Sequence, residues 1–217
     1  MYPISKLFAR IGLALFVGIF AASAHAAVVA GRDYVPVSPA QQTDTKGKVE
    51  VIEFFSYACP HCHAFEPTLE PWIKKLPKDV EFKRVPVIFR DTWGPLAKLY
   101  FALEAIGEVE RLHAAAFDAM HLDNINLSDP NIQADWVAKK GVDRKKFVDA
   151  YNSFSVQSKV NRAQQIAQGY KVSGVPAIAV AGRFMTSQSM AGSSEGTLRV
   201  VEELVEQVRR EIATSKK

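Results

Sequence analysis

The stretch from Val49 to Glu66 reads VEVIEFFSYACPHCHAFE. Its first part, Val49–Ser56, is apolar and rich in β-branched and aromatic residues apart from two glutamates, which predicts a buried strand. A helical pattern follows from Pro60, a residue favoured in a first helical turn, and the segment 80–89 (VEFKRVPVIF) predicts the next strand. The proline at position 86 favours an edge position for that strand. Strand, helix and strand in this order predict a βαβ unit.

Between the first strand and the helix lies Cys59-Pro60-His61-Cys62. A C-x-x-C pair beside a βαβ unit is typical of a thioredoxin-like redox motif. At the N-cap of the helix, the Cys59 sulfur would face unpaired backbone N–H groups and the positive end of the helix dipole, which favour thiolate over thiol. Cys62 would lie on the same helical face, one turn further in and less exposed.

His61 predicts the direction of the redox reaction. Its imidazole, placed between the two cysteines, can stabilise a Cys59 thiolate and therefore the reduced form. A disulfide whose reduced form is favoured oxidises other thiols strongly. A disulfide between the two cysteines would add little to stability, because a loop of two intervening residues constrains the unfolded chain very little.

The rest of the chain predicts mainly helices and then a return to strands. Amphipathic helices are expected between 96 and 169, with Trp136, Phe147 and Tyr151 as core residues. A hairpin is expected at 175–186 with its turn at Gly182, and a terminal helix at 197–213. The predicted fold class is α/β.

The N-terminus has the features of a cleavable secretory signal. Two basic residues precede an uncharged apolar run of 12 residues, 11–22, and Ala24 and Ala26 form an A-x-A cleavage site. A membrane anchor is the alternative, but a spanning helix needs roughly 20 residues. Without residues 1–26 the chain has 25 basic and 23 acidic side chains, and no basic run with interleaved aromatic residues suggests nucleic-acid binding. Export to an oxidising compartment is consistent with redox-active cysteines.

The cysteine motif has two metal-centred alternatives. Structural zinc needs about four ligands, and only two cysteines exist, so no metal site is expected. Attachment of c-type haem needs C-x-x-C-H, which His63 completes, but nothing else in the sequence indicates a cytochrome. His113 and His121 lie eight residues apart rather than four, and both are expected at the surface.

The segment 53–66 (EFFSYACPHCHAFE) resembles the active-site segment of the DsbA family, the periplasmic thiol:disulfide interchange proteins of Gram-negative bacteria. A second match, 172–177 (VSGVPA), is similar to the cis-proline loop of that family. The resemblance implies a thioredoxin fold with an inserted all-helical domain. Its implied divisions are a signal at 1–26, a thioredoxin-like domain at 27–92 and 170–217, and a helical insertion at 93–169. The 114 residues from Cys62 to Pro176 agree, because a simple crossover needs only about 10–12.

The resemblance also implies roles for the matched residues. Cys59 would attack and become linked to substrate, and Cys62 would be its partner, with Pro60 and His61 between them. Pro176 would follow a cis peptide bond, and Val175 would offer backbone hydrogen bonds to an extended substrate. The implied substrates are unfolded exported proteins with free cysteines, and the implied reoxidant is the quinone-linked membrane protein DsbB. No bound cofactor is implied, and the chain is expected to be a monomer in the periplasm.

Glu53 is the unusual residue of the first strand, because a buried carboxylate is costly unless it is paired or protonated. One interpretation is a buried acid with a raised pKa that exchanges protons with Cys62. The other is a structural ion pair with Lys83 or Arg84 on the next strand. Both can hold together, and the sequence does not choose between the two cations.

Two other functions remain open at this point. One is a disulfide isomerase or reductase on the same fold. The other is a chaperone-like peptide-binding module with incidental cysteines. Replacing Cys59 by serine separates the classes, because only the binding module would keep its function.

Overall fold

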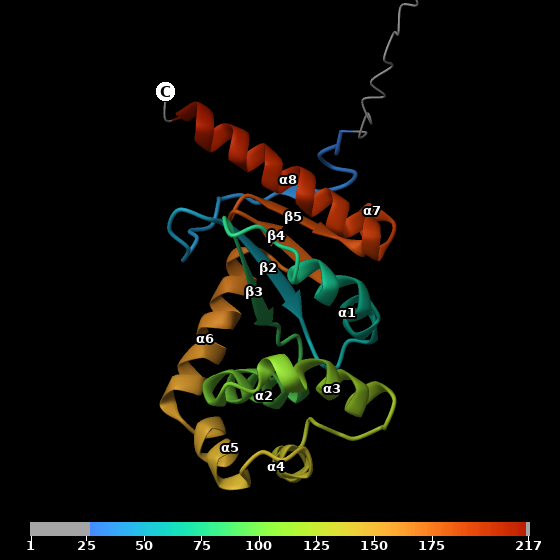
Figure 1. Ribbon diagram of the computed structural model, residues 1–217, viewed down its shortest axis with the longest axis vertical. Coiled ribbons are helices and arrows are strands. Elements are labelled where there is room, and N and C mark those ends of the chain that lie inside the picture. The colour runs from blue at the N-terminus through green and yellow to red at the C-terminus, as the bar shows by residue number, and fades with distance from the viewer. Residues whose placement is uncertain (1–26, 216–217) are drawn as a thin grey trace, which may run out of the picture.

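The computed structural model describes residues 27–215, and Figure 1 shows its ribbon. The predicted signal at 1–26 lies outside the described residues. One five-stranded sheet has the strand order β1-β5-β4-β2-β3. The strands are β1 (Val35–Pro36), β2 (Val49–Phe55), β3 (Val80–Pro86), β4 (Ala177–Val180) and β5 (Phe184–Ser187).

The βαβ unit predicted around the cysteines is confirmed. Strands β2 and β3 pair in parallel and are joined by helix α1 (Pro60–Ile73). Strand β3 lies at the sheet edge and ends at Pro86, earlier than the predicted position 89. Since proline has no N–H to donate to a neighbouring strand, an edge is where the chain tolerates it.

The predicted hairpin is also present. Strands β4 and β5 pair antiparallel, and Ala181 and Gly182 between them both have positive φ values, 52° and 71°. The Arg183 N–H donates to the Val180 carbonyl oxygen at 3.0 Å, so Ala181 and Gly182 are the central residues of a tight turn. Two successive positive φ values there are typical of turns that match the twist of the flanking strands. Position 182 also has no room for a side chain, because a Cβ there would lie 2.0 Å from the Gln41 carbonyl oxygen.

The helices fall into two groups. Helices α1 and α8 (Ser194–Ser215) cover one face of the sheet, where the core includes Phe65, Leu69, Val201 and Leu204. The second group lies between β3 and β4 in the chain, after a short 3₁₀ turn at Asp91–Trp93. Its members are α2 (Gly94–Ile106), α3 (Val109–His121), α4 (Pro130–Lys139), α5 (Arg144–Tyr151) and α6 (Phe154–Gly169). In Figure 1 these helices lie together below the sheet, with α6 running back along β3.

A second core cluster joins this helical group to the other face of the sheet. It contains Ile52 and Phe54 of β2 together with Trp136, Phe147 and Tyr151, which confirms that the three aromatic residues are core residues. The cysteines belong to the same cluster, at the junction between the sheet and the helical group. One further short helix, α7 (Gln188–Ala191), follows β5 and was not predicted from the sequence.

No helix within residues 27–215 is long and apolar enough to cross a membrane.

Candidate active site

Cys59 is the N-cap of α1, as the sequence predicts. Its backbone is extended, and its sulfur accepts a hydrogen bond from the Cys62 backbone N–H at 3.3 Å. The helix begins here because Pro60 occupies the first turn, where a missing N–H costs nothing. Both cysteines are free thiols in this structure. Cys62 is fully buried and Cys59 is 6% exposed, so the predicted difference in exposure is confirmed.

The environment lowers the pKa of Cys59 to about 6. The largest cause is the hydrogen bond from the Cys62 side chain, and backbone N–H groups of Cys62 and His61 add to it against the opposing effect of burial. The charge interaction with the His61 side chain is a smaller contribution. Most of the stabilisation of the thiolate therefore comes from the helix start and from Cys62.

The pKa of Cys62 shifts in the opposite direction. Burial raises it strongly, and the neighbouring Cys59 and Glu53 raise it further. The two sulfurs are therefore inequivalent: Cys59 is the one that ionises readily, and Cys62 is the one that retains a proton.

The second predicted motif lies beside Cys59. The Val175–Pro176 peptide bond is cis, in agreement with the family resemblance, and the Cys59 thiol donates to the Val175 carbonyl oxygen at 3.3 Å. A groove of about 620 Å³ runs along this loop. Its lining residues include His61, Val175, Pro176, Met185 and Met190.

Glu53 lies on β2 and is fully buried. Its Oε2 accepts a hydrogen bond from Arg84 Nε at 3.0 Å, whereas its Oε1 is buried without a partner. Lys83 instead pairs with Glu50, 2.7 Å away. Of the two cations left open by the sequence, Arg84 is therefore the partner of Glu53. Burial and the charge of Glu66 raise the pKa of Glu53 to about 8 despite Arg84.

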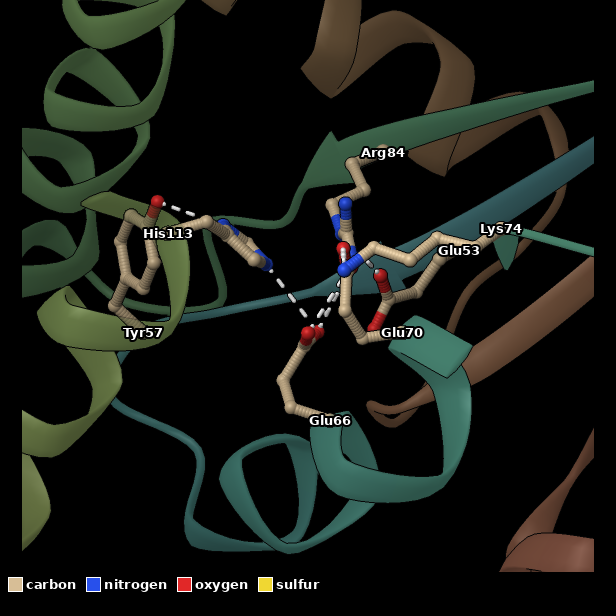
Figure 2. Close-up of polar contacts among 7 residues, drawn as sticks. All are labelled: Glu53, Tyr57, Glu66, Glu70, Lys74, Arg84 and His113. Atoms are coloured by element: carbon tan, nitrogen blue, oxygen red, sulfur yellow. Dashed lines mark hydrogen bonds and ion pairs between the residues drawn. The ribbon is translucent and has the colours of Figure 1, made fainter. Parts of the chain in front are cut away.

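The sequence analysis missed three members of the cluster around Arg84: Glu66, Glu70 and His113. Figure 2 shows Arg84 between the carboxylates of Glu53, Glu66 and Glu70, with His113 against Glu66. The expectation of a surface position for His113 is wrong, since it is 4% exposed. Helical spacing is the signal that could have identified two of them. Glu66 follows the buried Cys62 by four residues and His113 precedes the buried Phe117 by four, so each shares a helix face with a buried residue.

His121 is partly buried rather than a free surface residue. Its Nε2 lies 2.8 Å from the Tyr57 carbonyl oxygen, and its ring stacks on that of His63 with centroids 5.1 Å apart. His63 Nε2 in turn lies 2.9 Å from Asp118 Oδ1. The histidine that completes the C-x-x-C-H pattern thus joins α1 to α3.

Glu53, Glu66 and His113 are the group of side chains within residues 27–215 whose spacing could suit a metal ion. The guanidinium of Arg84 already bonds both carboxylates, however, and supplies the positive charge there. The donor set therefore fits an ion-pair cluster better than a metal site.

Comparison with known proteins identifies the family. Residues 50–195 match the model of the DSBA-like thioredoxin domain. The chain belongs to the DsbA family. It is 46% identical over 207 residues to the thiol:disulfide interchange protein DsbA of Burkholderia cepacia, covering 95% of this chain and 96% of that relative.

Solved structures of the DsbA family agree. The crystal structure of Pseudomonas aeruginosa DsbA matches with a TM-score of 0.83 and 40% sequence identity, covering 88% of this chain and 97% of that chain. DsbA of Xylella fastidiosa matches with a TM-score of 0.79 and 34% identity, over 84% of this chain and 98% of that one. The predicted thioredoxin fold and the predicted thiol:disulfide oxidoreductase activity are therefore confirmed.

Proposed function

We propose that the protein donates a Cys59–Cys62 disulfide to unfolded exported proteins. The observation that carries this proposal is the inequivalence of the two sulfurs, with a lowered pKa at Cys59 and a raised pKa at Cys62. A stabilised Cys59 thiolate favours the reduced enzyme, and an enzyme that favours its reduced form oxidises its substrates.

In the first step, a substrate thiolate attacks the Cys59 sulfur. A bond to the substrate sulfur forms, the Cys59–Cys62 bond breaks, and Cys62 leaves as a thiolate. Glu53 then gives its carboxyl proton to the Cys62 sulfur. This role suits Glu53 because burial, the nearby Glu66 charge and the raised pKa of about 8 keep it protonated at neutral pH.

In the second step, another substrate thiolate attacks the substrate sulfur of the mixed disulfide. Cys59 leaves as a thiolate, which the helix N-terminus stabilises with the backbone N–H of Cys62. The substrate has lost two electrons and the enzyme has gained them. The cysteines carry these electrons, so the reaction needs no bound cofactor.

The other predicted site residues have supporting roles. Pro60 starts the helix, and the charge interaction of His61 with the Cys59 sulfur favours the thiolate. Val175 and Pro176 line the groove next to that sulfur, where the backbone of an extended substrate would bind. We divide the chain as predicted, with residues 93–169 as a helical insertion in a thioredoxin-like domain.

The cellular setting is part of the same proposal. Residues 1–26 direct export, the mature protein acts in the periplasm as a monomer, and a DsbB-like membrane protein reoxidises it. The apolar run and the A-x-A pattern of the sequence support the export signal.

Oxidation of reduced, unfolded ribonuclease A tests the function. The oxidised enzyme should transfer its disulfide stoichiometrically, and its equilibrium with glutathione should lie far towards the reduced enzyme. Cys59→Ser should abolish transfer. If Cys59→Ser, with glutathione disulfide added as the oxidant, still promotes recovery of active ribonuclease as the wild type does, the binding module is favoured. A potential like that of thioredoxin with an ordinary Cys59 pKa would favour a reductase.

A further inference from the structure

Two buried carboxylates in this site share one guanidinium. Arg84 Nε donates to Glu53 at 3.0 Å, and Arg84 Nη2 donates to Glu66 Oε2 at 3.2 Å. Oxygen atoms of the two carboxyl groups and a ring nitrogen of His113 all lie within 4.8 Å of one another. Two carboxylates this close and away from water disfavour double ionisation, so one of them holds a proton.

His113 contacts only one member of this carboxyl pair. Its Nε2 lies 3.2 Å from Glu66 Oε1, and its Nδ1 lies 2.8 Å from the Tyr57 hydroxyl oxygen. An ionised carboxylate can only accept, so Nε2 carries the hydrogen that bonds Glu66, and Nδ1 of the neutral ring accepts from Tyr57. Figure 2 shows this chain from Tyr57 through His113 to Glu66.

Glu53 has no corresponding donor on its second oxygen, which is buried and unpartnered. An unpartnered buried oxygen costs much less on a neutral carboxyl group than on a carboxylate. The hydrogen-bond pattern is therefore asymmetric: it favours the negative charge on Glu66 and the proton on Glu53.

We propose that His113 decides which carboxyl group of the pair holds the proton. By donating to Glu66 it fixes the charge there and leaves the proton on Glu53, next to Cys62. His113 is a positioning residue, because it touches neither the sulfurs nor the substrate. The inference rests on the proposed function, in which Glu53 protonates Cys62.

The directions of the pKa shifts agree. Burial alone would raise the pKa of Glu66, but the hydrogen bond from His113 and the charge of Arg84 bring it below its usual value. Burial lowers the pKa of His113 and outweighs the effect of Glu66, so the ring stays neutral. The titratable and charged groups that face His113 come from β2 and the turn after it, α1, β3 and α2: Glu53, Tyr57, Glu66, Glu70, Arg84 and Tyr100.

Two substitutions of His113 form a matched pair. His113→Gln keeps an N–H donor for Glu66, whereas His113→Leu removes it at similar volume. Without the donor, Glu66 should take the proton and Glu53 should become the ionised partner of Arg84. His113→Gln should behave as the wild type.

Infrared spectroscopy of the reduced protein locates the proton. At about pH 6.5 exposed carboxyl groups are ionised, so a protonated carboxyl band reports the buried pair. The wild-type band should vanish in Glu53→Gln and persist in Glu66→Gln. In the His113→Leu background the band should instead persist in Glu53→Gln, because Glu66 without its donor takes the proton. A band that still vanishes in Glu53→Gln in that background would overturn the proposal.

The reaction of the oxidised enzyme with dithiothreitol gives a functional readout, after correction for the thiolate fraction of the reagent. The wild-type rate should fall as the pH rises through the pKa of Glu53, about 8. In His113→Leu the midpoint should move down by about one pH unit or more, the size expected for loss of such a hydrogen bond. In His113→Gln it should stay at the wild-type position.

If His113→Leu does not fold, Tyr57→Phe replaces it. That change removes the hydroxyl that holds the ring in the Nε2–H form, and the midpoint should move in the same direction by a smaller amount. An unchanged midpoint would count against the proposal.

Glu53→Gln distinguishes a failure of the proposed function from a failure of the inference about His113. If it leaves both the band and the pH profile unchanged, the role of Glu53 in the proposed function is wrong. If it removes both while His113→Leu keeps the wild-type pattern, only the inference about His113 is wrong.

Discussion

The two cysteines lie one helical turn apart in two different environments. Around Cys59 the chain presents a helix N-terminus, His61 and the Val175 carbonyl beside a groove. Beneath Cys62 lies a buried cluster with the acid Glu53. The first environment stabilises a negative charge, and the second holds a proton. This difference makes a symmetric dithiol into a pair with one sulfur that exchanges with substrate and one sulfur that retains a proton.

The largest effect is expected from removing the buried sulfur. In Cys62→Ser, Cys59 can still exchange into a substrate disulfide, but the mixed disulfide cannot be resolved by the enzyme. Turnover should fall to background while a covalent enzyme–substrate complex accumulates. Non-reducing electrophoresis detects this complex, and Cys59→Ser should form none.

The next effect concerns stability and sharpens the difference between the two environments. Folded Glu53 has a pKa of about 8 against an ordinary value of 4.5, so unfolding releases a proton between these values and the free energy of unfolding falls as the pH rises through this window. Glu53→Gln removes this slope and should stabilise the protein at pH 7.5 by on the order of 2 kcal/mol, with little difference near pH 4.5.

Urea denaturation over this pH range measures the slope. Glu81→Gln on β3 is the control, because Glu81 forms an exposed ion pair with Lys48. It should leave the free energy of unfolding and its pH dependence nearly unchanged, because an exposed ion pair contributes little to stability. An equal pH slope in Glu53→Gln and the wild type would contradict the buried-acid assignment.

A smaller effect is expected at Cys59. Its folded pKa of about 6 lies below the ordinary 9.0, so the thiolate stabilises the reduced protein fully above about pH 9, and this contribution is lost as the pH falls through 6. At pH 7.5 the contribution should be about 1 kcal/mol after allowance for partial exposure. Denaturation of the reduced and oxidised forms at pH 5 and pH 7.5 should show the difference between them changing by this amount in favour of the reduced form.

The smallest effect is expected from the side chain of His61. His61→Ala removes its charge interaction but keeps the backbone N–H groups that stabilise the thiolate. The pKa of Cys59 should rise by less than about one unit. Thiolate absorbance against pH measures the shift, and a rise to the value of free cysteine would mean that the imidazole, not the helix start, dominates.

Much of this site could be predicted from the sequence because its decisive features are local. The N-cap position of Cys59, the placement of both sulfurs on one helical face and the turn at Gly182 depend on residues that are neighbours in the chain. The burial of His113 could not be predicted from its eight-residue spacing to His121. It follows from the packing of α3 against the aromatic side chains of β2 and the turn after it, Phe55 and Tyr57.

By itself the sequence determined the redox motif, the βαβ unit around it and the difference in exposure between the two cysteines, since helical and strand periodicity set these over a few residues. Only the tertiary structure decided which groups control the protons. The parallel register of β2 and β3 sets Glu53 opposite Arg84 and Ile52 opposite Lys83, so Arg84 shares the face of Glu53. The approach of α1 and α3 then brings Glu66 and His113 to the same guanidinium cluster. Register and helix packing join residues far apart in the chain, and no local spacing specifies them.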